Sequence, residues 1–132
     1  MKIAILASEG APYAKSGGLG DVMEALPAAL QRIEGNEVVL LLPYYKKIMD
    51  NPAYEVEQVA QFYVALGWRQ CYAGIMKLKN PKDGVQVYFI DNLQYFGGRD
   101  AALYGHGDDG ERFAFFSKAC LDALVALDFI PD

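Results

Sequence analysis

The sequence predicts an α/β fold, and three consecutive segments near its beginning are the reason. Residues 2–7 are a short apolar run of the kind that forms a buried strand in a parallel sheet. A loop rich in small residues follows, and from Asp21 onward the apolar residues recur at helical spacing. Residues 37–42 are a second apolar run. Strand, glycine-containing loop, helix and strand form the first unit of a Rossmann-like parallel sheet.

The helix of this unit is predicted to begin at Asp21 and to end at Gly35-Asn36. Asp21 and Glu24 have the spacing of a capping box, which makes Asp21 a candidate N-cap. Pro27 predicts either a kink or the point where the regular helix begins. One side of the helix is expected to face the core, with Val22, Leu26, Leu30 and Ile33 on it.

The middle of the chain predicts a β-hairpin inserted into this sheet. Apolar residues alternate over residues 62–66 and again over residues 72–78, which indicates two or three strands with Gly67 near the bend. Residues 80–84 have the composition of a turn, and residues 85–90 read as a further strand.

The last third predicts a long loop and a helix. Residues 91–110 are rich in glycine, and loops of this length inside a domain are often functional. Residues 111–127 have helical periodicity, and apolar residues on several faces lead us to expect deep packing. Its main stripe comprises Phe113, Phe116, Cys120, Leu124 and Leu127, and its other faces carry Phe115, Leu121 and Val125.

Composition limits the classes of function. The 132 residues are 53% hydrophobic and 22% charged, which is typical of one globular domain. A net charge of −5 argues against binding to nucleic acid or to an anionic membrane surface. Cys71 and Cys120 have no metal-type spacing, so we expect reduced thiols and a cytoplasmic location. With His106 as the single histidine, we expect no metal and no other cofactor.

The strongest candidate site is the glycine loop Lys15-Ser16-Gly17-Gly18-Leu19-Gly20-Asp21-Val22. Glycines before a helix, next to a lysine, are a plausible cradle for a phosphate. The loop is no Walker A motif, and it fails the dinucleotide fingerprint because Met23 stands where the third glycine belongs. The alternative is a tight turn with glycines for geometry alone and a solvated Lys15.

Separated blocks of the sequence, in the right order, carry a resemblance to one family. They are Ser8-Glu9-x-x-Pro12-x-x-Lys15-x-Gly17-Gly18-Leu19-Gly20-Asp21-Val22, then Tyr88-Phe89-Ile90-Asp91-Asn92, Tyr95-Phe96 and Leu103-Tyr104-Gly105, and then Glu111-Arg112-Phe113-Ala114-Phe115-Phe116-Ser117. This pattern resembles the bacterial glycogen synthase and plant starch synthase family. The resemblance covers nearly the whole chain, and it is least diagnostic over residues 54–79.

The resemblance implies a retaining glycosyltransferase of two Rossmann-like domains that moves glucose from ADP-glucose to the non-reducing end of an α-1,4-glucan. Residues 1–132 would form part of its N-terminal, acceptor-side domain. Lys15 would contact the sugar nucleotide near its phosphates, and the amides around Gly17 and Gly18 would face the same region. N–H donors, a helix N-terminus and a cation stabilise the charge that develops on departing ADP.

The resemblance also implies roles for four further residues. Glu9 and Asp21 would border the sugar and acceptor side of the cleft, the alternative for Asp21 being a plain N-cap. Tyr95 and Phe96 would stack on acceptor glucose rings, or else anchor their loop by hydrophobic packing. The other polar residues of this region are expected to be structural, namely Arg99, His106, Glu111 and Arg112.

The chain departs from the family in length. The family's enzymes are much longer, and their later histidine block and second domain are not in these residues. We therefore expect the chain alone to be inactive, with the remainder of a synthase as its partner. We also expect self-association through an open sheet edge or the apolar hairpin. The alternative function is a stand-alone, non-catalytic module that binds a nucleotide or a glucan.

Overall fold

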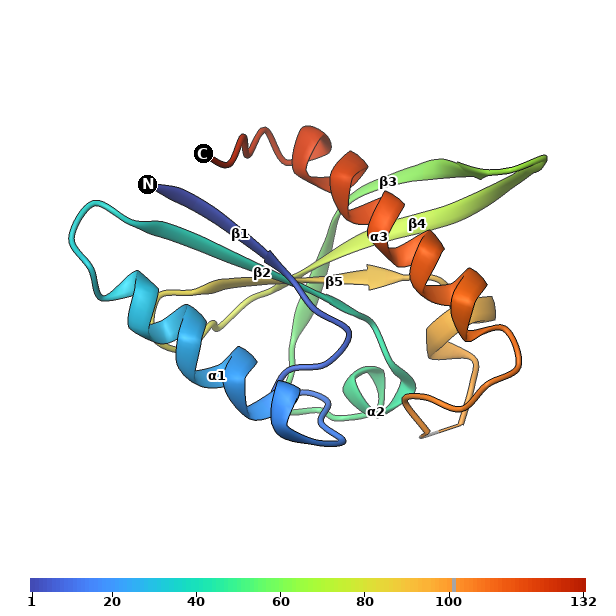
Figure 1. The fold of residues 1–132 in the computed structure, drawn as a ribbon, viewed down its shortest axis with the longest axis horizontal. Coiled ribbons are helices and arrows are strands. Elements are labelled where there is room, and N and C mark those ends of the chain that lie inside the picture. Colours follow the sequence, from blue (N-terminus) through green and yellow to red (C-terminus); the bar gives the residue numbers. More distant parts are fainter. Residues whose placement is uncertain (101) are drawn as a thin grey trace.

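A five-stranded mixed sheet forms the centre of the computed structural model, which describes residues 1–100 and 102–132 (Figure 1). The spatial order is β1-β2-β5-β4-β3. β1, β2 and β5 run parallel to one another, whereas the β5–β4 and β4–β3 pairs are antiparallel. The strands are β1 (Lys2–Leu6), β2 (Glu37–Pro43), β3 (Val56–Leu66), β4 (Arg69–Leu78) and β5 (Gln86–Asp91). The predicted α/β class is confirmed.

The helices pack against different parts of this sheet. α1 (Gly18–Gln31) contacts β2, and α3 (Asp109–Ala126) crosses β3, β4 and β5 (Figure 1). The short α2 (Lys46–Met49) lies against η1 (Leu93–Gly97), a π-helical turn. Because the parallel strands share one direction, the loops that follow β1, β2 and β5 leave the same edge of the sheet. That edge carries the glycine loop.

The β3–β4 hairpin extends the sheet, because β4 pairs directly with β5. Gly67 turns the hairpin with a φ of +62°, a conformation that residues with a side chain rarely adopt. Next to it, Trp68 is 89% exposed, with the Arg69 guanidinium 5.3 Å from its ring centroid. The predicted hairpin with its bend at Gly67 is therefore confirmed.

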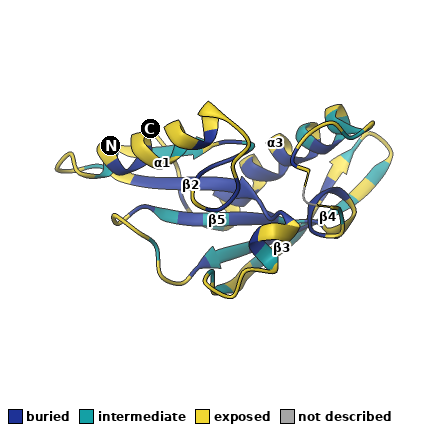
Figure 2. Cartoon of the chain, turned by 90° about the horizontal axis from the view of Figure 1, so that it is seen from below, coloured by how far each residue is buried: buried dark blue, intermediate teal, exposed yellow. Residues whose placement is uncertain are grey.

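β2 carries the densest part of the core. Its residues from Val38 to Pro43 are buried on both faces, as the continuous apolar run predicts for a strand flanked on both edges (Figure 2). Phe89 and Ile90 of β5 lie beside it and are fully buried. This rigid pair of strands supports the loops at the carboxyl edge.

The buried stripe predicted for α1 is wrong at three of its four residues, and only Leu30 packs against the core. Val22, Leu26 and Ile33 are exposed, whereas Gly20, Pro27 and Ala28 face the sheet. Small residues on that face allow close approach of the helix to the sheet, and the larger apolar side chains consequently lie outside. The helix continues through Pro27.

α3 is likewise buried on one face only. Phe115, Ala119 and Cys120 are fully buried, but Leu121 and Val125 are largely exposed. The expectation of deep packing on several faces is therefore wrong for the side that carries these two residues. No helix among residues 1–100 and 102–132 is both long and apolar enough to cross a membrane.

The outer edge of β1 is met by the last residues of the chain. The Asp132 amide donates to the Lys2 carbonyl at 2.9 Å, and the Lys2 amide donates to Asp132 Oδ2 at 2.7 Å. Both termini therefore lie at the same edge of the sheet (Figure 1).

Candidate functional site

The segment that follows β1 folds back on itself before it enters α1. Gly10 and Ala14 exchange two backbone hydrogen bonds of 2.8 and 2.9 Å, which closes a small loop around a cis Ala11–Pro12 peptide bond. The Tyr45 hydroxyl donates to the Ser8 carbonyl at 2.7 Å. These contacts bring residues 15–18 to the carboxyl end of β1, which is where α/β sheets place ligands.

Glu9 holds the glycine loop from behind. Its carboxylate accepts hydrogen bonds from the Ser16 amide at 2.8 Å, the Ser16 hydroxyl at 2.9 Å and the Gly17 amide at 3.1 Å. Glu9 is only 3% exposed. Burial raises its pKa, but the hydrogen bonds from Ser16, Tyr104 and Gly17 outweigh this and lower the pKa to about 2. Glu9 is therefore ionised and acts as a structural acceptor.

Tyr104 supplies a further hydrogen bond to this carboxylate, a role that the sequence did not indicate. Its hydroxyl donates to Glu9 Oε1 at 2.7 Å and lies 2.7 Å from Ser8 Oγ. Since a phenol has one hydrogen and here gives it to Glu9, the Ser8 hydroxyl must donate to Tyr104. No local pattern could reveal a contact between residues 95 positions apart.

The three glycines of the loop differ in what surrounds them. A Cβ at Gly20 would lie 2.8 Å from Lys15 Cγ and 2.9 Å from Glu9 Oε2, so the fold itself requires glycine there. A Cβ at Gly17 or at Gly18 would meet nothing within 4 Å. Gly17 is also extended, with a φ of −164°, which any residue can adopt. The space in front of Gly17 and Gly18 is open and leaves room for a ligand.

Lys15 and Asp21 form an ion pair, with Lys15 Nζ 2.7 Å from Asp21 Oδ1 and both side chains about half exposed. The hydrogen bond to Asp21 raises the pKa of Lys15, so the amine is charged at neutral pH. The N-cap of α1 is Gly17, without a side-chain cap, and Asp21 lies one turn inside the helix. The N-cap and capping-box roles predicted for Asp21 are therefore wrong.

Tyr95 and Phe96 lie in the core, each 1% exposed. The Tyr95 ring is 5.1 Å from that of Phe115, and the Phe96 ring is 5.5 Å from that of Tyr45. Neither ring face is open to a glucose ring in this structure, because other aromatic side chains cover them. Of the two alternatives for these residues, the geometry agrees with the hydrophobic anchor and not with stacking.

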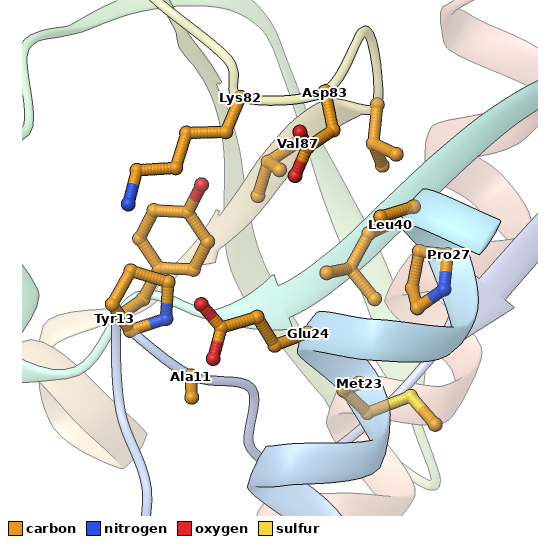
Figure 3. A pocket seen from close by; sticks show the side chains of 12 residues that line it. Ala11, Tyr13, Met23, Glu24, Pro27, Leu40, Lys82, Asp83 and Val87 are labelled. Carbon is orange, nitrogen blue, oxygen red and sulfur yellow. The ribbon is translucent and has the colours of Figure 1, made fainter. Parts of the chain in front are cut away.

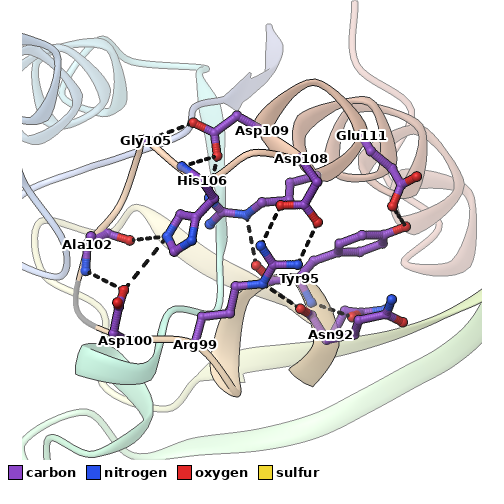
Figure 4. Close-up of polar contacts among 12 residues, drawn as sticks. Asn92, Tyr95, Arg99, Asp100, Ala102, Gly105, His106, Asp108, Asp109 and Glu111 are labelled. Carbon is purple, nitrogen blue, oxygen red and sulfur yellow. Dashed lines mark hydrogen bonds and ion pairs between the residues drawn. The ribbon is translucent and has the colours of Figure 1, made fainter.

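The loop before α3 is held by paired charges (Figure 4). Arg99 binds both carboxylate oxygens of Asp108, and this hydrogen bonding lowers the pKa of Asp108. Asp109 accepts from the Gly105 amide at 2.8 Å and from the His106 amide at 3.2 Å. His106 Nε2 lies 2.9 Å from the Ala102 carbonyl. The structural roles expected for Arg99 and His106 agree with these contacts.

Arg112 connects this loop with the core. It is 1% exposed and donates to the carbonyls of Tyr95 and Leu103 and to Asp109 Oδ1. Its guanidinium lies 5.1 Å from the ring centroid of Phe96. Glu111, next to Arg112 in the first turn of α3, binds both Arg69 and the Tyr95 hydroxyl.

Two hollows are lined in part by the segment that follows β1, although none of residues 15–22 lines either of them. One, of about 430 Å³, opens at the carboxyl end of β1 and is lined by Ser8, Tyr104 and Asp109 together with apolar side chains. The other lies beside α1, with Glu24, Lys82 and Asp83 around Tyr13 (Figure 3). Burial raises the pKa of Tyr13 to about 12. Only the first hollow shares the sheet edge with Glu9 and Gly17. Within the described residues, no group of three or more His, Cys, Asp or Glu side chains could hold a metal ion.

Comparison with known proteins adds a family to this geometry. Residues 2–132 match the family model of the starch synthase catalytic domain. The glycogen synthase of Streptococcus equi subsp. zooepidemicus (strain H70) is 50% identical over 133 residues, which cover all of this chain and 27% of that protein. The glycogen synthase of Streptococcus pneumoniae (strain CGSP14) is 48% identical over 132 residues, again 27% of its length. The chain thus spans about a quarter of these relatives.

The fold has a solved counterpart. The catalytic domain of starch synthase IV from Arabidopsis thaliana, bound to ADP and acarbose, superimposes with a TM-score of 0.83 at 30% identity. The superposition covers 98% of this chain and 26% of that structure.

Proposed function

Because this chain belongs to the family of starch synthase catalytic domains, we propose that it forms one wall of the active site of a glycogen or starch synthase. The reaction is transfer of glucose from ADP-glucose to the non-reducing end of an α-1,4-glucan, with retention of configuration. The single observation that carries this proposal is the open space before Gly17 and Gly18, beside a charged Lys15, at the N-terminus of α1.

The chemistry of the step explains why these groups suit it. Cleavage of the bond between glucose and ADP leaves negative charge on the diphosphate. The free end of α1 presents backbone N–H groups and a partial positive charge, and the Lys15 amine adds a full one. Groups fixed before the reaction stabilise the transition state more than groups that must reorganise. Glu9 provides this fixing, since it accepts from the amides of Ser16 and Gly17 and so orients the backbone before Gly18. The Gly17 amide, which was expected to face the ligand, is therefore used by Glu9, and the N–H groups left for a phosphate are those of the first residues of α1.

The choice of substrates rests on the relatives. The starch synthase IV structure is described as bound to ADP and acarbose, which supports an adenine nucleotide as donor and a glucan as acceptor. Asp21 would border the sugar after Lys15 turns from it toward the phosphates. Tyr95 and Phe96 would not contact the glucan, but their packing in the core would hold the acceptor side of the site in place. A cytoplasmic location belongs to this proposal, on the strength of the unpaired Cys71 and Cys120.

The charges around the loop indicate that this wall does not act alone. Glu9 and Asp21 contribute two negative charges and Lys15 one positive charge, which leaves a local net charge of −1. A dianionic diphosphate needs further cations. We propose that the remainder of a synthase supplies them, and that the chain by itself transfers no glucose from ADP-glucose to glycogen above a buffer control.

A chimera tests the proposal. In the Streptococcus equi glycogen synthase, the 27% of the protein that matches this chain would be replaced by residues 1–132. We expect the folded chimera to incorporate radioactive glucose from ADP-glucose into glycogen, and much less from UDP-glucose. The unmodified relative and the isolated chain are the two controls. The proposal would be refuted by a folded chimera that elutes at the same volume as its parent in size-exclusion chromatography and yet transfers no glucose.

A further inference from the structure

We propose that Tyr104 is a positioning residue that holds the glycine loop in its ligand-ready form through Glu9, and couples that loop to residues 102–108. Its functional meaning rests on the proposed function, whereas the coupling itself is a property of the ligand-free chain. Tyr104 touches neither Gly17 nor Lys15 in the contacts described above. Tyr104 acts on the glycine loop only through the Glu9 carboxylate, which accepts hydrogen bonds from both Tyr104 and the loop.

The first half of the connection is the Glu9 carboxylate. Each of its oxygens serves two donors, with Ser16 Oγ and the Tyr104 hydroxyl on Oε1 and the Ser16 and Gly17 amides on Oε2. Hydrogen bonds to an ionised acceptor are about twice as strong as neutral ones. Loss of the Tyr104 hydroxyl leaves Oε1 with one donor, so we expect the nearly buried carboxylate to hold the loop amides less firmly.

The second half lies between Tyr104 and the core. The Tyr104 ring packs on Phe113, with centroids 5.8 Å apart. The next two backbone amides, of Gly105 and His106, donate to Asp109, whose carboxylate is in turn paired with the buried Arg112 at 2.8 Å. The Arg112 side chain is itself held in place, since its Nε donates to the Tyr95 carbonyl.

Two groups of hydrogen bonds, joined covalently through Tyr104, thus connect the first turn of α3 with the first turn of α1. They connect parts of the chain that are far apart in sequence and that contact each other little otherwise. Disorder in residues 102–108 would consequently reach the amides of Ser16 and Gly17. In a synthase, the order or disorder of residues 102–108 would therefore change the affinity of the glycine loop for ADP-glucose.

Nuclear magnetic resonance of the labelled chain tests the coupling without any ligand. Tyr104→Phe keeps the ring contact with Phe113 and removes only the hydroxyl. We expect the pKa of Glu9 to rise from about 2 toward 4.5, and amide exchange at Ser16 and Gly17 to accelerate about tenfold. Exchange at Leu41, in the core of β2, should not change. Asp109→Asn should accelerate exchange at the same two amides from a greater distance.

Tyr54→Phe is the matched control, since the Tyr54 hydroxyl donates to the Pro12 carbonyl of the same segment at 3.3 Å without touching Glu9. It should leave the pKa of Glu9 unchanged. Tyr104→Phe with parental values for both the pKa of Glu9 and the exchange at Gly17 would overturn the coupling, as would an equal effect of Tyr54→Phe.

The chimera then separates the coupling from the proposed function. Tyr104→Phe should raise the KM for ADP-glucose severalfold and leave the KM for glycogen unchanged. An inactive parental chimera would count against the proposed function alone, since the measurements on Glu9 need no substrate.

Discussion

Lys15 Nζ lies 2.7 Å from Asp21 Oδ1, so the only lysine of the glycine loop is held by a carboxylate one helical turn inside α1. The pair is exposed, and exposed pairs contribute little to stability. A doubly charged phosphate group can therefore take the amine from Asp21 at small cost. This relationship sets the resting position of Lys15 beside the open space before Gly18.

Replacement of this lysine should damage function and spare the fold. In the chimera, Lys15→Met should lower kcat/KM for ADP-glucose by about 100-fold, because a charge-assisted contact is lost. Lys46→Met is the matched control, since Lys46 forms a similar exposed pair with Asp50 at 3.0 Å. Steady-state kinetics of the two variants check this. Equal activities would contradict the role of Lys15.

Alanine at the three glycines should separate fold from binding. Gly20→Ala should lower the free energy of unfolding by about 1–3 kcal/mol, because its Cβ would overlap Lys15 and Glu9. Gly17→Ala and Gly18→Ala should stay within about 0.5 kcal/mol of the parent chain, since their Cβ atoms meet open space. Urea denaturation measures all three. In the chimera, the latter two variants should nevertheless raise the KM for ADP-glucose.

Acid should weaken the chain through Glu9. The folded-state pKa of about 2 lies below the ordinary value of 4.5, so the ionised group stabilises the fold above pH 4.5. This contribution, on the order of 3 kcal/mol, is lost as the pH falls from about 4.5 to about 2. Urea denaturation at several pH values should show this loss. In Glu9→Gln, which should be less stable at pH 7, the pH dependence over this range should be correspondingly smaller.

Arg112 should be the most sensitive arginine of the chain. Arg112→Met removes the donor to the carbonyls of Tyr95 and Leu103 and the cationic partner of the Asp109 carboxylate. We expect a loss of about 3 kcal/mol in the free energy of unfolding. Arg32→Met, at an exposed position, should change it by less than about 0.5 kcal/mol. Chemical denaturation of both variants would contradict this reasoning if the losses were similar.

The isolated chain should self-associate. β1 and β3 are the two edge strands of the sheet, and Val22 and Leu26 of α1 are exposed apolar side chains, as is Ile33 just beyond its end. Static light scattering should show an apparent mass that rises with concentration, and Leu26→Glu should reduce this rise. A constant monomer mass over the same range would contradict the expectation.

The sequence predicted the elements better than their faces. The runs that became β1, β2 and β5 and the bend at Gly67 follow from local chemistry, which a single sequence displays. The burial predicted for residues 2–7 is wrong over β1, however, because this strand lies at the edge of the sheet and none of its residues is fully buried. The buried side of α1 does not, since it depends on how closely small residues such as Gly20 and Ala28 let the helix approach β2. Periodicity placed Leu26 inside, and close packing placed it outside.

The candidate site shows the same division. Lys15 and Gly18 were identifiable because they belong to one short segment before a helix. The Tyr104 hydroxyl on Glu9 was not, because that contact exists only after the sheet and α3 have assembled. Tyr95 and Phe96 were predicted to lie in a long loop but belong to the π-helical turn η1, and their burial among other aromatic side chains is a tertiary property that their sequence neighbours do not reveal.

Trp68 is the single tryptophan of the chain and lies at the tip of the β3–β4 hairpin, 89% exposed. Its intrinsic fluorescence therefore reports the solvent around that tip and little of the core. Emission should change only slightly when the chain unfolds, so circular dichroism is the better monitor of its stability. For the same reason, a blue shift on mixing with another molecule would locate the contact at the hairpin without any added label.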